Sequence, residues 1–155
     1  MNNKWHKRFM DLAEQIAEWS KDRSTKVGAI IIDDKRTILA TGYNGFPRGI
    51  DDDIEERHER PAKYQWTEHA ERNAIYSAAR NGISLEGSTI YVPWMPCSDC
   101  MRGIVQSGIK TVIVKKIDEN DPKQKRWAES HAFSLQIVEE SEVELLYYED
   151  LMEEK

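Results

Sequence analysis

The first twenty residues carry hydrophobic side chains at helical spacing. The apolar positions that recur every three or four residues are Trp5, Phe9, Leu12, Ala13 and Ile16. This spacing places them on one face of a helix, with charged residues on the other. The pattern predicts an amphipathic helix of about four turns that ends near Trp19. Its aromatic face indicates packing in the core and not a binding site.

Short β-branched runs predict four strands. Residues 27–32 and 37–42 are separated by a polar turn, which favours an antiparallel hairpin. The runs at 89–93 and 110–114 enclose a helical pattern over 98–107. A strand, helix and strand in this order predict a parallel pair joined by a right-handed crossover.

The remaining hydrophobic patterns complete the predicted fold. Small residues at positions 70, 74 and 78 predict a helix over 69–81 that packs closely on a sheet. Charged, aperiodic residues at 50–66 predict a solvated loop. Residues 134–138 predict a fifth strand after a charged, helix-like segment at 121–129, and residues 142–152 predict a last helix. We therefore expect the α/β class, with a mixed five-stranded sheet between two helical layers in an α-β-α sandwich.

Composition limits the class of protein. A chain of 155 residues is the size of one domain, so residues 1–155 are expected to form a single unit. The net charge of -6 disfavours a nucleic-acid partner, because phosphate backbones bind basic surfaces. No apolar run reaches the length of about 20 residues that crosses a bilayer, and the first residues lack a signal-peptide core. These features predict a cytoplasmic protein that does not bind membranes.

One histidine, one glutamate and two cysteines have the spacing of a metal site. His69 and Glu71 can serve one site only if they lie at a helix start and project past its end. Pro96 likewise favours a helix start at Cys97 and Cys100. Three ligands, His69, Cys97 and Cys100, would leave the fourth position of a tetrahedral Zn²⁺ open to water. Glu71 then has the position of a general acid/base.

Non-catalytic alternatives remain open at this point. A structural zinc module would normally have four protein ligands, so a fourth ligand at the metal would indicate one. A regulatory or oligomerisation subunit could keep the fold without turnover. The presence of Glu71 beside all three ligands favours the enzyme.

The pattern His-x-Glu followed by Pro-Cys-x-x-Cys is typical of zinc-dependent nucleobase deaminases. Three further segments, at 20–29, 42–49 and 104–110, resemble deoxycytidylate (dCMP) deaminases in the expected order. The resemblance covers roughly residues 16–115. It implies the cytidine deaminase fold, one catalytic Zn²⁺ per chain, and hydrolysis of dCMP to dUMP and ammonia for thymidylate synthesis. A deaminase of cytidine or of tRNA adenosine would have the same zinc chemistry and remains the alternative.

The resemblance also implies residues that bind the nucleotide. Asn44 would bind the sugar 3'-hydroxyl, although composition alone favours a turn residue there. Lys26 matches a position that contacts phosphate, against the alternative of an exposed lysine. Trp94 would either wall the pyrimidine or close the core beneath the metal turn. Ala70 and Ser98 complete the expected substrate-binding set, and Arg48 and Arg102 are further candidates for the phosphate.

Regulation by nucleotides is implied by the resemblance alone. In several members of the family, the segment that matches residues 42–49 contributes to a pocket for dCTP and dTTP between subunits. The candidate effector-binding residues here are Gly42, Tyr43, Gly45, Phe46 and Arg48. Mg²⁺ would accompany such a nucleotide, and the chain would form a homo-oligomer, by family analogy a hexamer.

Overall fold

The protein is built on one mixed five-stranded sheet. A computed structural model describes residues 1–154. The strands are β1 (Gly28–Ile32), β2 (Ile38–Tyr43), β3 (Thr89–Val92), β4 (Thr111–Val114) and β5 (Glu144–Tyr147), in the spatial order β2-β1-β3-β4-β5. β1 is antiparallel to both β2 and β3, whereas β3, β4 and β5 are parallel. The predicted hairpin and the predicted parallel pair are both confirmed.

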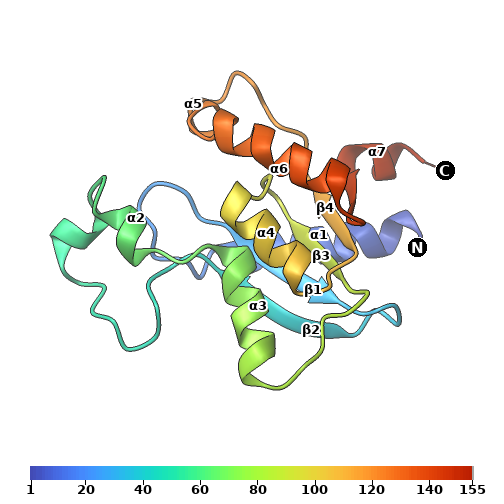
Figure 1. The fold of residues 1–155 in the computed structure, drawn as a ribbon, viewed down its shortest axis with the longest axis horizontal. Coiled ribbons are helices and arrows are strands. Elements are labelled where there is room, and N and C mark those ends of the chain that lie inside the picture. Colours follow the sequence, from blue (N-terminus) through green and yellow to red (C-terminus); the bar gives the residue numbers. More distant parts are fainter. Residues whose placement is uncertain (155) are drawn as a thin grey trace.

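Helices cover both faces of the sheet (Figure 1). One layer contains α3 (Ala70–Arg80), α4 (Ser98–Gln106) and α6 (Ala128–Glu140). The opposite layer contains α1 (Asn3–Ala17) and the short α7 (Tyr148–Glu153), which contact each other. Every residue of β1 is buried, because its side chains pack alternately against the two layers. The predicted three-layer sandwich is confirmed.

The last third of the chain differs from the prediction. Residues 134–138, predicted as a strand, belong to α6, and the fifth strand lies at 144–147, inside the predicted last helix. The buried face of α6 is formed by His131 and Ser134, while Phe133 and Leu135 are exposed. Because the fully buried positions are polar and two apolar ones are exposed, the sequence shows no clear helical period, although Ile137 and Val138 pack against the core. Pairing of β5 with β4 then outweighs the helical spacing around Leu146.

Two long connections leave the compact layers at one side of the molecule (Figure 1). The first contains a 3₁₀ turn, η1 (Glu55–His58), and α2 (Lys63–Trp66), within the stretch predicted as a solvated loop. The second contains α5 (Pro122–Lys125), which precedes α6. Within the described part of the chain, no helix combines the length and the apolar character that a membrane crossing requires.

Close contact between α3 and β2 positions the start of α3. A Cβ atom on Gly42 would lie 2.3 Å from the carbonyl oxygen of Ala70 and 2.5 Å from the backbone nitrogen of Ala74. Only glycine allows this approach, and Ala70, Ala74 and Ala78 are completely buried beside it. At the far end, Gly82 has φ +67 and follows the helix as a left-handed cap. The sheet therefore sets the position of the first turn of α3.

Candidate active site

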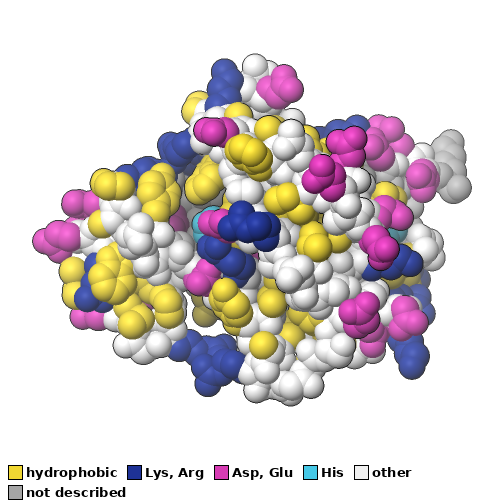
Figure 2. Space-filling view, viewed as in Figure 1, with side chains coloured by type: hydrophobic (Ala, Val, Ile, Leu, Met, Phe, Trp, Pro, Cys, Tyr) yellow, Lys and Arg dark blue, Asp and Glu magenta, His cyan; other side chains and the backbone are white. Residues whose placement is uncertain are grey.

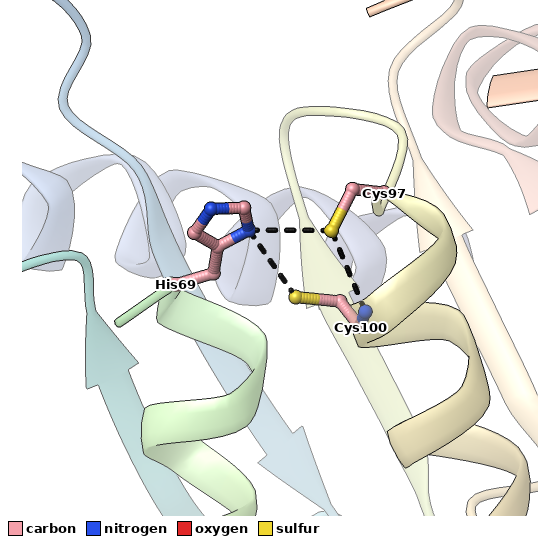
Figure 3. Close-up of side chains that lie close together, drawn as sticks. All are labelled: His69, Cys97 and Cys100. Carbon is pink, nitrogen blue, oxygen red and sulfur yellow. Dashed lines mark hydrogen bonds between the residues drawn. The ribbon is translucent and has the colours of Figure 1, made fainter. Parts of the chain in front are cut away.

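Two helix starts bring three metal-binding side chains together (Figure 3). His69 immediately precedes α3, Cys97 immediately precedes α4, and Cys100 lies in the first turn of α4. The Nδ1 atom of His69 lies 3.3 Å from Sγ of Cys97 and 3.4 Å from Sγ of Cys100. The backbone N–H of Cys100 donates to Sγ of Cys97 over 3.4 Å. All three ligand atoms lie within 4.8 Å of one another.

This cluster fits zinc. Zn–S bonds of about 2.3 Å and Zn–N bonds of about 2.0 Å at a tetrahedral angle require S···N separations of about 3.5 Å. The observed separations of 3.3 and 3.4 Å agree with that value. Among residues 1–154, no fourth histidine, cysteine or carboxylate joins the cluster. Three ligands with one open position are typical of a catalytic zinc site and not of a structural one.

Electrostatics favour a thiolate in the cluster. A hydrogen bond from Cys100 and the neighbouring His69 outweigh burial and lower the pKa of Cys97 to about 4. The pKa of Cys100 is raised by the hydrogen bond to Cys97 and by burial. Both sulfurs lie at the positive end of the α4 dipole, which also stabilises negative charge. A Zn²⁺ ion would supply the further charge needed to keep both sulfurs deprotonated.

Glu71 lies beside the cluster in the first turn of α3, with only 5% of its surface exposed. Burial raises the pKa of its carboxyl group above the usual value. A carboxyl group whose pKa is raised holds a proton more readily, which suits a group that must accept and return one. Its position next to a metal site is that of a general acid/base.

A cavity opens onto these residues. Its inner wall includes His69, Glu71 and Cys97, and its other walls come from several distant segments. Figure 2 shows Lys and Arg side chains beside a hollow between the α2 segment and the layer of α3 and α4. The cavity joins the metal cluster to solvent, so a small molecule can reach the cluster.

The structure places three of the five predicted substrate-binding residues at this cavity. Asn44, Ala70 and Trp94 line it. The Asn44 amide accepts a hydrogen bond from the Val27 N–H and donates one to the Thr25 carbonyl, each over 2.8 Å. These bonds fix the amide at the cavity wall and tie the segment after β2 to the residues before β1. Its contact with a sugar stays a prediction.

The other two predicted substrate-binding residues lie elsewhere. Lys26 is 45% exposed, lies 3.9 Å from a carboxylate oxygen of Glu18, and is not part of the cavity wall. Ser98 is also absent from the wall, and its backbone N–H donates to Oγ of Ser130 over 2.8 Å. Arg102 forms an exposed ion pair with Asp99. Lys26, Ser98 and Arg102 therefore do not line the cavity.

Four basic residues line the cavity that the sequence patterns did not identify as part of a site. They are Arg60, Lys63, Lys123 and Arg126. Two come from the connection around α2 and two from the connection around α5, which are about sixty residues apart in the sequence. No local spacing links them, so only the fold could identify them as one group. Tyr64 of α2, Trp127 just before α6 and His131 of α6 reach the same cavity.

Hydrogen bonds hold three of these basic residues around the loop that follows α1. Arg60 donates to Oγ of Ser24 over 3.1 Å, and Lys63 lies 3.2 Å from a carboxylate oxygen of Asp22. Lys123 donates to the Ser24 carbonyl. Among the described residues, Arg126 forms no ion pair, so its guanidinium is available to a ligand.

The five candidate effector-binding residues share a second cavity. Gly42, Tyr43, Gly45, Phe46 and Arg48 all line it, together with Tyr76 and Arg80 of α3. Phe46 stacks on the ring of His58, with centroids 4.8 Å apart. The structure thus brings these residues together at a site separate from the metal cluster. Ligand binding there stays a prediction.

Comparison with known proteins identifies the family. A family model described as the cytidine and deoxycytidylate deaminase zinc-binding region matches residues 3–116. A deaminase of Aliivibrio fischeri, called uncharacterized, is 40% identical over 147 residues, which is 95% of each chain. The deoxycytidylate deaminase of Mus musculus is 36% identical over 125 residues, covering 77% of this chain and 69% of that protein.

A solved structure extends the comparison to three dimensions. The dCMP deaminase of cyanophage S-TIM5, in complex with dCMP and dUMP, superposes with a TM-score of 0.75 and 28% sequence identity. The match covers 95% of this chain and 98% of that chain. The region matched by the family model includes Glu71 and the three candidate metal ligands, His69, Cys97 and Cys100. The chain therefore belongs to the cytidine and deoxycytidylate deaminase family.

Proposed function

We propose that this protein is a zinc-dependent deaminase that converts dCMP and water to dUMP and ammonia. The observation that carries the proposal is the three-ligand cluster with the buried Glu71 beside it, at the inner wall of an open cavity. Zinc in such a site supplies a water molecule activated at neutral pH. Similarity to deoxycytidylate deaminases and to a structure that contains dCMP and dUMP supports the choice of substrate.

Glu71 moves the protons in this proposal. It accepts a proton from the attacking water and delivers protons to the ring nitrogen and to the amino group that leaves as ammonia. The raised pKa of its carboxyl group suits both roles. Asn44, Ala70 and Trp94 would hold the nucleoside, with the amino-bearing carbon turned towards the cluster.

The basic residues at the cavity favour a nucleotide over a nucleoside. A monophosphate is a dianion that binds Lys and Arg through charge-assisted hydrogen bonds. Arg60, Lys63, Lys123 and Arg126 provide such charge locally, although the chain as a whole carries a net charge of -6. A tRNA substrate would need a broad basic surface, so the acidic chain disfavours this alternative.

The proposal is tested by measuring ammonia release from the zinc-loaded protein. The substrates are dCMP, CMP, deoxycytidine and a tRNA anticodon stem, and the Glu71→Gln protein is the blank. We expect turnover of dCMP well above the other three, loss of turnover after chelation, and recovery when Zn²⁺ is returned. Preferred turnover of deoxycytidine or of the tRNA stem would replace dCMP as the substrate. No turnover of any of them would contradict the deaminase.

We further propose that the second cavity binds a nucleotide effector, dCTP with Mg²⁺ or dTTP, in a cytoplasmic homo-oligomer, by family analogy a hexamer. The shared location of Gly42, Tyr43, Gly45, Phe46 and Arg48 supports this. The test measures dCMP turnover and molecular mass by light scattering with each nucleotide, for the wild type and Arg48→Ala. We expect a rate change that Arg48→Ala weakens. An unchanged rate with both nucleotides would contradict regulation here.

A further inference from the structure

His131 is a buried polar side chain at the inner end of the cavity. It is 6% exposed and lines the cavity with His69, Glu71 and Cys97. Its ring forms no hydrogen bond with any residue from 1 to 154. Its ring nitrogens are not among the fully enclosed polar atoms of residues 1–154, so they reach the cavity, where a ligand can supply a hydrogen-bond partner.

Two serines hold α6 against the metal-binding turn on either side of His131. Oγ of Ser130 accepts a hydrogen bond from the Ser98 N–H over 2.8 Å. Oγ of Ser134 donates to the Pro96 carbonyl over 2.7 Å. Since His131 lies between these serines in the same helix, its position relative to Cys97 is fixed. The ring is therefore a rigid part of the wall near the cluster.

Lys123, Trp127 and His131 line the cavity at four-residue intervals. Lys123 is exposed, Trp127 is half-buried and His131 is buried, so the three run from solvent to the interior. The ring of Trp127 lies edge-on to that of His69, with centroids 5.9 Å apart. Lys123 belongs with the basic residues at the outer end. His131 lies at the end where the reacting carbon must sit.

We propose that His131 contacts the base of the bound nucleotide and forms a hydrogen bond with its polar edge. The proposal rests on the proposed function, because it takes a pyrimidine nucleotide as the ligand. Burial lowers the pKa of His131, which favours a neutral ring with one donor and one acceptor nitrogen. Such a ring can match the amide-like pattern of donors and acceptors on a pyrimidine. His131 is then a specificity-determining residue supplied by α6, outside the region of the family match.

Two substitutions test the contact in the zinc-loaded protein. His131→Phe keeps an aromatic ring but removes both hydrogen-bonding atoms, whereas His131→Gln keeps a donor and an acceptor. We expect His131→Phe to lower kcat/KM for dCMP about 10–100-fold, the effect of losing one buried hydrogen bond to substrate. His131→Gln should retain clearly more activity. Zinc content and melting temperature should match the wild type in both.

A direct readout distinguishes contact with the base from a structural role. The ¹⁵N resonances of the His131 ring should shift when dUMP is added to the wild type, and should not shift with deoxyribose 5-phosphate, which lacks the base. Leu135→Ala, on the exposed side of the same helix, is the control and should keep wild-type kinetics.

The outcomes separate this inference from the proposed function. A wild type that deaminates dCMP, with unchanged kcat/KM in His131→Phe, would overturn the contact and leave the function intact. An equal shift with deoxyribose 5-phosphate would assign His131 to the sugar phosphate instead. A wild type that turns over no dCMP and shows no shift with dUMP would overturn both.

Discussion

Glu71 combines two properties that seldom occur together in a carboxylate, near-complete burial and a place at the start of a helix. The helix start favours its charged form, whereas burial favours its neutral form. We expect Glu71→Gln to lower the turnover of dCMP by about 10²–10⁴-fold, because glutamine cannot carry a proton. Metal analysis should find one zinc per chain, since the three ligands are unchanged. Turnover within tenfold of the wild type would exclude Glu71 as the acid/base.

Asp22 ties the loop after α1 to α2. Its Oδ1 accepts from the backbone N–H groups of Ser24 and Thr25 over 2.8 and 3.0 Å, and the side chain pairs with Lys63. Burial acts to raise the pKa of Asp22, but these two N–H groups and Lys63 outweigh it, so the pKa lies below its usual value. The charged form is thus favoured in the folded protein.

We expect Asp22→Asn to lower the free energy of unfolding at pH 7 by about 1–3 kcal/mol. A lowered pKa in the folded state stabilises above the unfolded value of about 3.9, and this contribution is lost as the pH falls through the folded value. Urea unfolding from pH 7 to pH 3 should therefore show the difference between wild type and variant shrinking below about pH 4. Asp11→Asn, which breaks an exposed pair with Lys7, should change stability by less than about 1 kcal/mol.

The three candidate metal ligands lie together in the structure because each belongs to a short motif at a helix start. A short motif has the same local geometry in any fold that begins a helix there. Lys26 shows the limit of such reasoning. It lies next to a predicted strand, but the side chain extends towards Glu18 and away from the cavity. Side-chain direction at an exposed position depends on neighbours that a single sequence does not specify.

The contact between α3 and β2 at Gly42 controls where the active-site helix begins. Gly42→Ala would place a methyl group against the Ala70 carbonyl, so α3 must move away from the sheet. We expect a loss of about 1–3 kcal/mol in the free energy of unfolding, measured by urea denaturation. The turnover of dCMP should also fall, because Ala70 is adjacent to His69 and Glu71.

Gly45→Ala is the matched control for this packing. A Cβ atom on Gly45 would have no heavy atom within 4 Å, and its backbone does not require a positive φ. Its unfolding free energy should stay within about 0.5 kcal/mol of the wild type. Equal losses in the two variants would show that the glycine content of the segment matters, and not the helix contact.

Secondary structure was predictable where one face of an element is uniformly apolar. α1 buries Phe9, Met10 and Ala13 on one side, and its bounds nearly match the prediction. α6 instead buries Ser134, whose hydroxyl group donates to the Pro96 carbonyl next to Cys97. Its hydrophobic residues therefore do not recur at a regular helical spacing. The prediction failed at α6, whose fully buried side chains are polar.

Charge is distributed unevenly over the molecule. The net charge is -6, yet four basic side chains line one cavity. Within residues 1–154, Arg126 is the one among them whose side chain forms neither an ion pair nor a hydrogen bond, since Lys63 pairs with Asp22 and the other two bond to Ser24. We expect Arg126→Ala to raise KM for dCMP roughly 10–100-fold, the effect of one charge-assisted hydrogen bond. Steady-state kinetics with deoxycytidine should show little change, because that substrate has no phosphate.

Arg102→Ala is the control for Arg126→Ala. Arg102 is exposed, pairs with Asp99 and lies outside the cavity wall, so its loss should leave KM for dCMP within about twofold of the wild type. A larger effect of Arg102→Ala than of Arg126→Ala would indicate that the phosphate binds near Arg102, beside α4.

The two connections that border the cavity carry no metal ligand, and the ordered sandwich carries none of its basic residues. The positive charge proposed for the phosphate is therefore supplied by other segments than the candidate metal ligands. Residues 54–67 and 122–126 lie outside the strands of the sheet and outside the metal cluster. A lineage could thus alter how the phosphate is bound by exchanging these two segments, and a protein engineer could do the same by grafting them between relatives.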